Sequence, residues 1–76
     1  MNFQEFVSSS EVNFAKIKRN YPNIRKGQFL LNHLHSVKPD LANMLAFEPH
    51  NVNDPYYDDG KIPSFWTFVE QNWNQQ

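Results

Sequence analysis

Apolar residues recur at helical spacing in four stretches of the chain, and prolines and glycines separate these stretches. The first stretch, within residues 1–21, has apolar side chains mostly three or four positions apart, and Asn2 can cap it. Three serines at positions 8–10 weaken its middle, because their hydroxyls compete for backbone hydrogen bonds. Ser10 can instead cap a second helix, so the pattern predicts either one bent N-terminal helix or two short ones.

The middle of the chain, residues 24–47, predicts two helices that meet at Pro39. Residues 24–37 place their large apolar side chains on one face and form the strongest helical pattern. Gly27 lies near the start of this helix, where a glycine costs about 1 kcal/mol relative to alanine. We therefore expect another helix to approach closely at that position. Pro39 suits the first turn of the next helix, which we expect to end near Phe47.

Residues 48–60 are rich in turn-forming residues and predict an ordered, acidic loop. Asp54 is expected to form a turn before Pro55, and Gly60 to adopt a positive φ. Either Asp58 or Asp59 is expected near the positive end of the last helix, and the two tyrosines at the edge of the core. The final helix spans residues 62–73 and has a broad aromatic side.

These elements predict an all-α fold, a compact bundle of three to four short helices with one ordered acidic loop. The chain has 76 residues, of which 39% are hydrophobic and 16% aromatic, so it predicts a single helical domain over residues 1–76. That length excludes a doubly wound α/β fold, a TIM barrel and a two-domain enzyme.

The composition also bears on the compartment. The chain contains no cysteine, which excludes disulfides and thiolate metal sites and suits a reducing compartment. A membrane-spanning helix needs about 20 consecutive apolar residues, and the longest apolar run here, residues 44–47, has only four. The N-terminus lacks the cationic and apolar regions of a secretory signal. We therefore expect a cytoplasmic protein that does not associate with membranes.

The charges are segregated, although the net charge is only −1. Residues 1–38 have six lysines and arginines and two glutamates, and thus carry +4, whereas residues 39–76 carry −5. The two halves can neutralise each other by packing together, or they can attract charged partners.

Four motifs occur in order: GQFLLNHL at residues 27–34, PDLA at 39–42, DPYYDD at 54–59, and a closing Trp73. This pattern resembles small uncharacterised proteins of phages and bacteria that carry GQxxxNxL, PDLA, DPxYDD and a terminal Trp. The resemblance covers roughly residues 21–73. It implies a compact helical domain and a phage origin, and it brings neither a reaction nor catalytic residues.

No motif in the chain indicates catalysis, a metal or a cofactor. An EF-hand loop that began at Asp54 would place Tyr56 and Phe65 at ligand positions, where neither side chain suits calcium. His33 and His35 are two positions apart, so in a helix they point to different faces. Because no nucleophile motif is present either, we expect that the protein is not an enzyme, and we predict no catalytic residue, metal or cofactor.

The remaining hypotheses concern binding. The favoured one is a small protein-binding module, encoded by a phage, that modulates or inhibits a host protein in the host cytoplasm by occupying its surface. The residues expected to bind that partner combine negative charge with aromatic area: Asp54, Tyr56, Tyr57, Asp58, Asp59 and Trp66. The alternative is a nucleic-acid-binding regulator that uses a basic segment, Lys16, Lys18, Arg19, Arg25 and Lys26. The pI near 6.2 argues against the alternative. A third hypothesis is a self-associating assembly protein.

Overall fold

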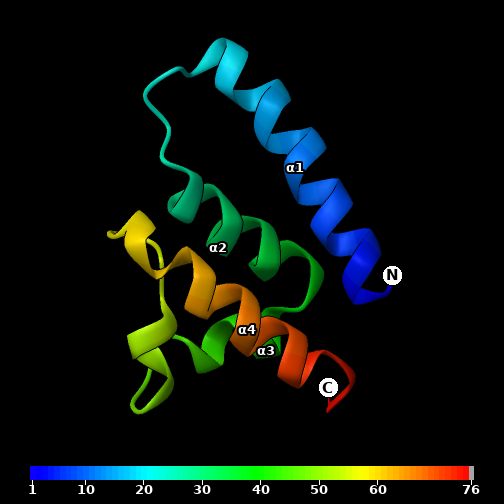
Figure 1. Cartoon of the computed structure of the whole chain (residues 1–76), viewed down its shortest axis with the longest axis vertical. Helices are drawn as coiled ribbons and strands as arrows, with labels where there is room; N and C mark the ends of the chain where they lie inside the picture. The colour runs from blue at the N-terminus through cyan, green and yellow to red at the C-terminus, as the bar shows by residue number, and fades with distance from the viewer. Residues whose placement is uncertain (76) are drawn as a thin grey trace.

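The structure, a computed structural model, describes residues 1–75 and is built from helices and turns. Its α-helices are α1 (Phe3–Asn20), α2 (Lys26–Val37), α3 (Pro39–Met44) and α4 (Ile62–Asn72). Short 3-10 turns η1 (His50–Asn53), η2 (Asp59–Lys61) and η3 (Trp73–Gln75) lie between and after them. Figure 1 shows α2, α3 and α4 grouped together while α1 runs along one side. The predicted all-α bundle is therefore confirmed.

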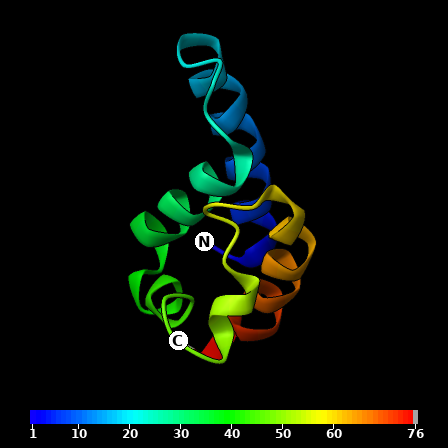
Figure 2. The same ribbon diagram turned by 90° about the vertical axis from the view of Figure 1, so that its left-hand side faces the viewer.

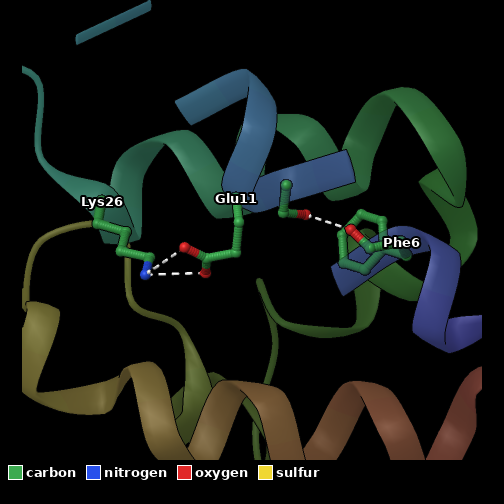
Figure 3. Close-up of polar contacts among 4 residues, drawn as sticks. Phe6, Glu11 and Lys26 are labelled. Carbon is green, nitrogen blue, oxygen red and sulfur yellow. Dashed lines mark hydrogen bonds and ion pairs between the residues drawn. The ribbon is translucent and has the colours of Figure 1, made fainter. Parts of the chain in front are cut away.

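The N-terminal segment forms one continuous helix rather than two. Its start is fixed by a capping box, in which Asn2 Oδ1 accepts from the Glu5 amide at 2.8 Å and Glu5 Oε1 accepts from the Asn2 amide at 2.9 Å. Ser10 is fully buried, and its hydroxyl donates to the Phe6 carbonyl at 2.7 Å (Figure 3). The serine therefore bonds back to its own helix and does not cap a second one.

The core is formed mainly by the apolar faces of α2, α3 and α4. α2 lies in the middle and buries Leu30, Leu31 and Leu34 along one stripe, as its helical pattern predicted. α3 is shorter than expected, since it ends at Met44 and a turn follows before Phe47. The buried apolar side chains are Phe6, Leu30, Leu31, Leu34, Leu41, Ala42, Leu45, Phe65, Phe68, Val69 and Trp73.

An aromatic cluster attaches the first turns of α1 to α4 and the C-terminal turn. The Phe6 ring lies 5.8 Å from Trp66 and 5.1 Å from Trp73, measured between ring centroids. Phe3 contacts the same two tryptophans edge-on, at 6.1 and 6.0 Å. Trp73 also donates its indole N–H to the Met1 carbonyl at 3.3 Å, so the two ends of the described chain lie together.

The other half of α1 stands clear of the body. Both views show the end of this helix extending beyond α2 and the loops (Figures 1 and 2). A single non-helical connection leads from it back to α2. The last ring contact along α1 is between Phe14 and Phe29, at 5.6 Å. Beyond Ile17, every residue from 18 to 23 is exposed.

Two expectations about the glycines are wrong. A side chain at Gly27 would overlap the Pro55 carbonyl oxygen and would lie 2.8 Å from Asp59 Oδ1, so a loop approaches this glycine and not another helix. Gly60 does not have a positive φ, because the chain turns there in the 3-10 turn η2, whose N-cap Asp58 accepts from the Gly60 amide at 2.8 Å.

Candidate binding surfaces

Residues 54–59 are the acidic part of the predicted loop 48–60, and from here on they are called the acidic loop. They are hydrogen-bonded to the start of α2. Arg25 donates to the carbonyls of Tyr56 and Tyr57, at 2.6 and 3.2 Å. The Asp59 carboxylate accepts from the Gly27 amide at 3.0 Å. α2 has no capping bond from its own N-cap side chain, so Asp59 supplies the missing acceptor and a negative charge at the positive helix end. Asp58 or Asp59 was expected near the start of the last helix; both residues directly precede α4 along the chain, and the Asp59 carboxylate also caps α2.

The other two aspartates of the acidic loop shape the loop itself. Asp54 Oδ1 accepts from the Tyr56 amide at 2.9 Å, which forms the turn that the sequence predicted before Pro55. Asp58 Oδ1 accepts from the Gly60 amide at 2.8 Å. Asp58 and Asp59 are nevertheless exposed. The same carboxylates therefore order the loop and bring negative charge to its surface.

The two tyrosines of the acidic loop lie differently. Tyr56 is half-buried against the core, and its hydroxyl accepts from the Gln28 side chain at 3.1 Å. Tyr57 is 80% exposed, although it was expected at the edge of the core. Its ring packs edge-on against Tyr56 at 4.7 Å and lies 5.9 Å from the Arg25 guanidinium. The loop thus displays one aromatic ring in a fixed position.

Trp66, the sixth residue predicted to bind a partner, points elsewhere. It is half-buried, and its ring contacts are with Phe3, Phe6 and Phe65, at 5.3 to 6.1 Å. The contacts with Phe3 and Phe6 hold α1 on α4, whereas the acidic loop packs on the start of α2. Trp66 is therefore half-buried, and its contacts with Phe3 and Phe6 attach α1.

The basic segment divides into two groups. Arg25 and Lys26 have partners within the chain, Arg25 in the acidic loop and Lys26 in an ion pair with Glu11 at 2.9 Å (Figure 3). The other three cations, Lys16, Lys18 and Arg19, are exposed on the far half of α1 and make no ion pair within residues 1–75. The first group therefore serves the fold, and the second remains accessible.

The histidines lie apart. His33 is half-buried between α1 and α2, with its ring stacked on Phe6 at 5.2 Å and on Phe29 at 5.6 Å. Its Nε2 is 3.3 Å from the Ser9 hydroxyl, and burial lowers the pKa of the imidazole. His35 is exposed, and among residues 1–75 no three or more metal-binding side chains gather at one point. The sequence offered no sign of the ring stack, because Phe6 is distant along the chain.

An open groove of about 350 Å³ runs between η1 and α4. The rings of His50 and Phe68, 5.1 Å apart, belong to its lining. The hydroxyls of Ser64 and Thr67 in the same lining donate to carbonyls of the preceding turn, at 3.0 and 3.2 Å. Both hydroxyl hydrogens are thus used in hydrogen bonds to the backbone of the protein.

None of the helices in residues 1–75 is long and apolar enough to span a membrane. Comparison of the chain with protein families, with curated proteins and with solved structures finds no match. The function must therefore be inferred from the surfaces of the molecule itself.

Proposed function

We propose that the protein is a small non-enzymatic module that binds another protein through the acidic loop. The observation that carries this proposal is Tyr57, an aromatic ring with 80% of its surface exposed beside two exposed carboxylates. A free aromatic ring at the protein surface is a typical anchor of a protein interface, where tyrosine is among the most frequent energetic hot spots.

The loop is suited to binding because it is ordered before a partner arrives. Arg25 holds its backbone at two carbonyls, and Gly27 packs directly against its Pro55 carbonyl. A surface that is already ordered loses less conformational entropy on binding, so more of the contact energy is expressed as affinity. The partner is expected to present a basic surface with an apolar pocket, because the loop offers negative charge around a ring.

The resemblance to small phage and bacterial proteins adds a biological setting to the proposal. In that setting the module is encoded by a phage, acts in the host cytoplasm and modulates or inhibits a host protein by occupying its surface. A compact loop with a net negative charge competes well for a basic site, because complementary charge raises the association rate.

The test removes the charge of the loop but keeps its shape. The double variant Asp58→Asn and Asp59→Asn retains an acceptor oxygen for the Gly60 and Gly27 amides, which a change to lysine would not. We expect capture of a specific partner from host lysate by the wild-type chain, and at least tenfold weaker binding of that purified partner by the double variant, about 1.4 kcal/mol.

A charge-matched control is available outside the acidic loop, in α3 and α4. The double variant Asp40→Asn and Glu70→Gln also removes two exposed carboxylates and should bind the partner like the wild type. A second pair of variants tests the Tyr57 ring. Tyr57→Ser should lose binding of the partner. Its control, Val52→Ser, changes an apolar side chain of η1 that is 64% exposed, and it should bind the partner like the wild type. Equal binding by all variants, or no partner for the wild-type chain, refutes the proposal.

A further inference from the structure

The far end of α1 is an exposed basic projection, separate from the acidic loop. We call residues 15–23 the basic arm; they comprise the last turns of α1 and the start of the connection to α2. All of them are exposed except Ile17, which is half-buried. Figures 1 and 2 both show this end of the helix protruding from the body. A binding partner can therefore surround the arm on several sides.

The cations of the arm pair with no carboxylate within residues 1–75, although Lys18 Nζ lies 5.5 Å from the Phe14 ring centroid and two of the cations lie in the last turn of α1. Between positions 12 and 26 the sequence has five lysines and arginines and no aspartate or glutamate. The nearest carboxylate along the helix, Glu11, is paired with Lys26 at 2.9 Å (Figure 3). Lys16, Lys18 and Arg19 thus have no ionic partner within residues 1–75, and they attract an external anion.

The placement of these three cations around the helix indicates the shape of that anion. Successive residues of an α-helix are turned by about 100°, so Lys18 lies nearly opposite Lys16, and Arg19 lies between them. A flat anionic surface, such as a bilayer or an acidic protein face, would contact only one side of such a helix. Cations on several sides suit a groove with anions on both walls, and the major groove of DNA has phosphates along both edges.

The dimensions agree with a groove. The helical part of the arm, residues 15–20, is about 9 Å long and about 10–12 Å across with its side chains. The major groove of B-form DNA is about 12 Å wide and about 8.5 Å deep, whereas the major groove of duplex RNA is too narrow for side chains to read. At the tip, exposed Tyr21 and Asn23 add polar groups that can bond to phosphate or sugar oxygens.

We propose that the basic arm binds duplex DNA by entering its major groove, with Lys16, Lys18 and Arg19 contacting phosphates on both sides. The binding is independent of base sequence, because no base-reading side chain is fixed in position by the fold. It does not depend on the acidic loop and adds a second binding surface to the proposed function. Since the whole chain carries a net charge of −1, affinity must be low at physiological salt.

The experiment measures fluorescence anisotropy of a labelled 20-base-pair DNA duplex with the full chain at several salt concentrations. Three phosphate contacts predict a slope of about −2.7 for log K against log salt, or about 40-fold weaker binding at 200 mM than at 50 mM. The Lys16→Gln variant removes one contact, and the same change in salt should then weaken its binding only about 12-fold.

The control is Lys61→Gln, which removes one cation from η2, outside the arm, and should bind DNA with the same salt slope as the wild type. The triple variant Lys16→Gln, Lys18→Gln, Arg19→Gln should lose binding while its circular dichroism stays helical. Duplex RNA of the same length and anionic phosphatidylserine vesicles should bind at least tenfold more weakly than DNA.

Several results overturn the inference. One is the absence of DNA binding at 50 mM salt, and another is equal loss of binding in Lys16→Gln and Lys61→Gln. Equal affinity for RNA or for vesicles shows that the arm recognises negative charge and not a groove. If the triple variant loses only thermal stability and still binds DNA, the cations serve the negative end of the helix dipole instead.

Discussion

Replacing Gly27 by alanine should detach the acidic loop from α2, because no room exists for a side chain there. A Cβ at this position would overlap the Pro55 carbonyl oxygen, a backbone atom that cannot rotate away, and would lie 2.8 Å from Asp59 Oδ1. Forced overpacking costs about 1–3 kcal/mol, and losing the charged hydrogen bond to the Gly27 amide adds about 1.5–3 kcal/mol. The better helix propensity of alanine returns about 1 kcal/mol. The net loss is therefore about 1.5–5 kcal/mol.

Urea unfolding followed by circular dichroism measures this loss as a change in the free energy of unfolding. In a thermal melt followed by the same signal, each 1 kcal/mol corresponds to about 4–8 °C in Tm for a domain of this size, so the variant should melt well below the wild type. The matched control is Gly60→Ala, where the nearest atom to the new Cβ is the carboxylate Asp58 Oδ1 at 3.0 Å and the backbone φ is not positive. That control should lie within about 1 kcal/mol of the wild type.

The difference in stability between the two glycine variants is the decisive quantity. If Gly27→Ala is as stable as Gly60→Ala, the loop does not pack tightly against the start of α2. If the variant is stable overall but loses the partner bound through Tyr57, the loop has moved without unfolding the core. The second result would still support the packing, since it separates the position of the loop from global stability.

Four further changes test the attachment of α1. Phe6→Ala should lower the free energy of unfolding by about 3–5 kcal/mol, because the Phe6 ring is fully buried among Trp66, Trp73 and the His33 ring. A smaller loss in chemical denaturation would mean that α1 packs loosely on the body. Asn2→Ala should cost about 1 kcal/mol by breaking the capping box, whereas Asn2→Asp should cost nothing measurable in the same assay. Lys26→Gln should cost less than about 1 kcal/mol, since its exposed ion pair is screened, and high salt should abolish the difference. Burial lowers the pKa of His33 in the folded protein, so the unfolded chain takes up a proton at a higher pH than the folded chain does. The free energy of unfolding should therefore fall as the pH drops below about 6.5. Between about pH 7.5 and 5.5, this free energy should depend less on pH in the His33→Gln variant.

The helices follow from local features that a sequence shows directly. Pro39 starts α3, and the apolar stripe of α2 marks its buried side, so the amino-acid pattern alone locates both helices, although not the end of α3. Asn2 and the residue three positions later form a cap that a short motif reveals. The serines in α1 were ambiguous, because a hydroxyl can either cap a new helix or bond back to its own, and only burial of Ser10 decides between these.

The acidic loop depends instead on contacts that no local pattern reveals. Asp59 and Gly27 are 32 positions apart, and the glycine by itself predicts a close approach without saying of what. Tyr56 and Tyr57 are adjacent and chemically alike, yet one packs on the core and the other is exposed. Their difference arises from the direction in which Arg25 and the turn at Asp54 hold the backbone, and that direction is a property of the assembled fold.

The segregated charges of the sequence have a consequence that the structure makes specific. The halves do meet, as one hypothesis held, but they meet mainly through backbone groups: Arg25 bonds to loop carbonyls and Asp59 to an amide. Such contacts satisfy the fold without neutralising net charge, so the acidic loop stays acidic and the basic arm stays basic. Under the two proposals above, these opposite charges would steer two kinds of partner to different sites. At low salt, the arm of one molecule should also attract the acidic loop of another, so light scattering under dilute and concentrated conditions would detect a weak association that salt removes.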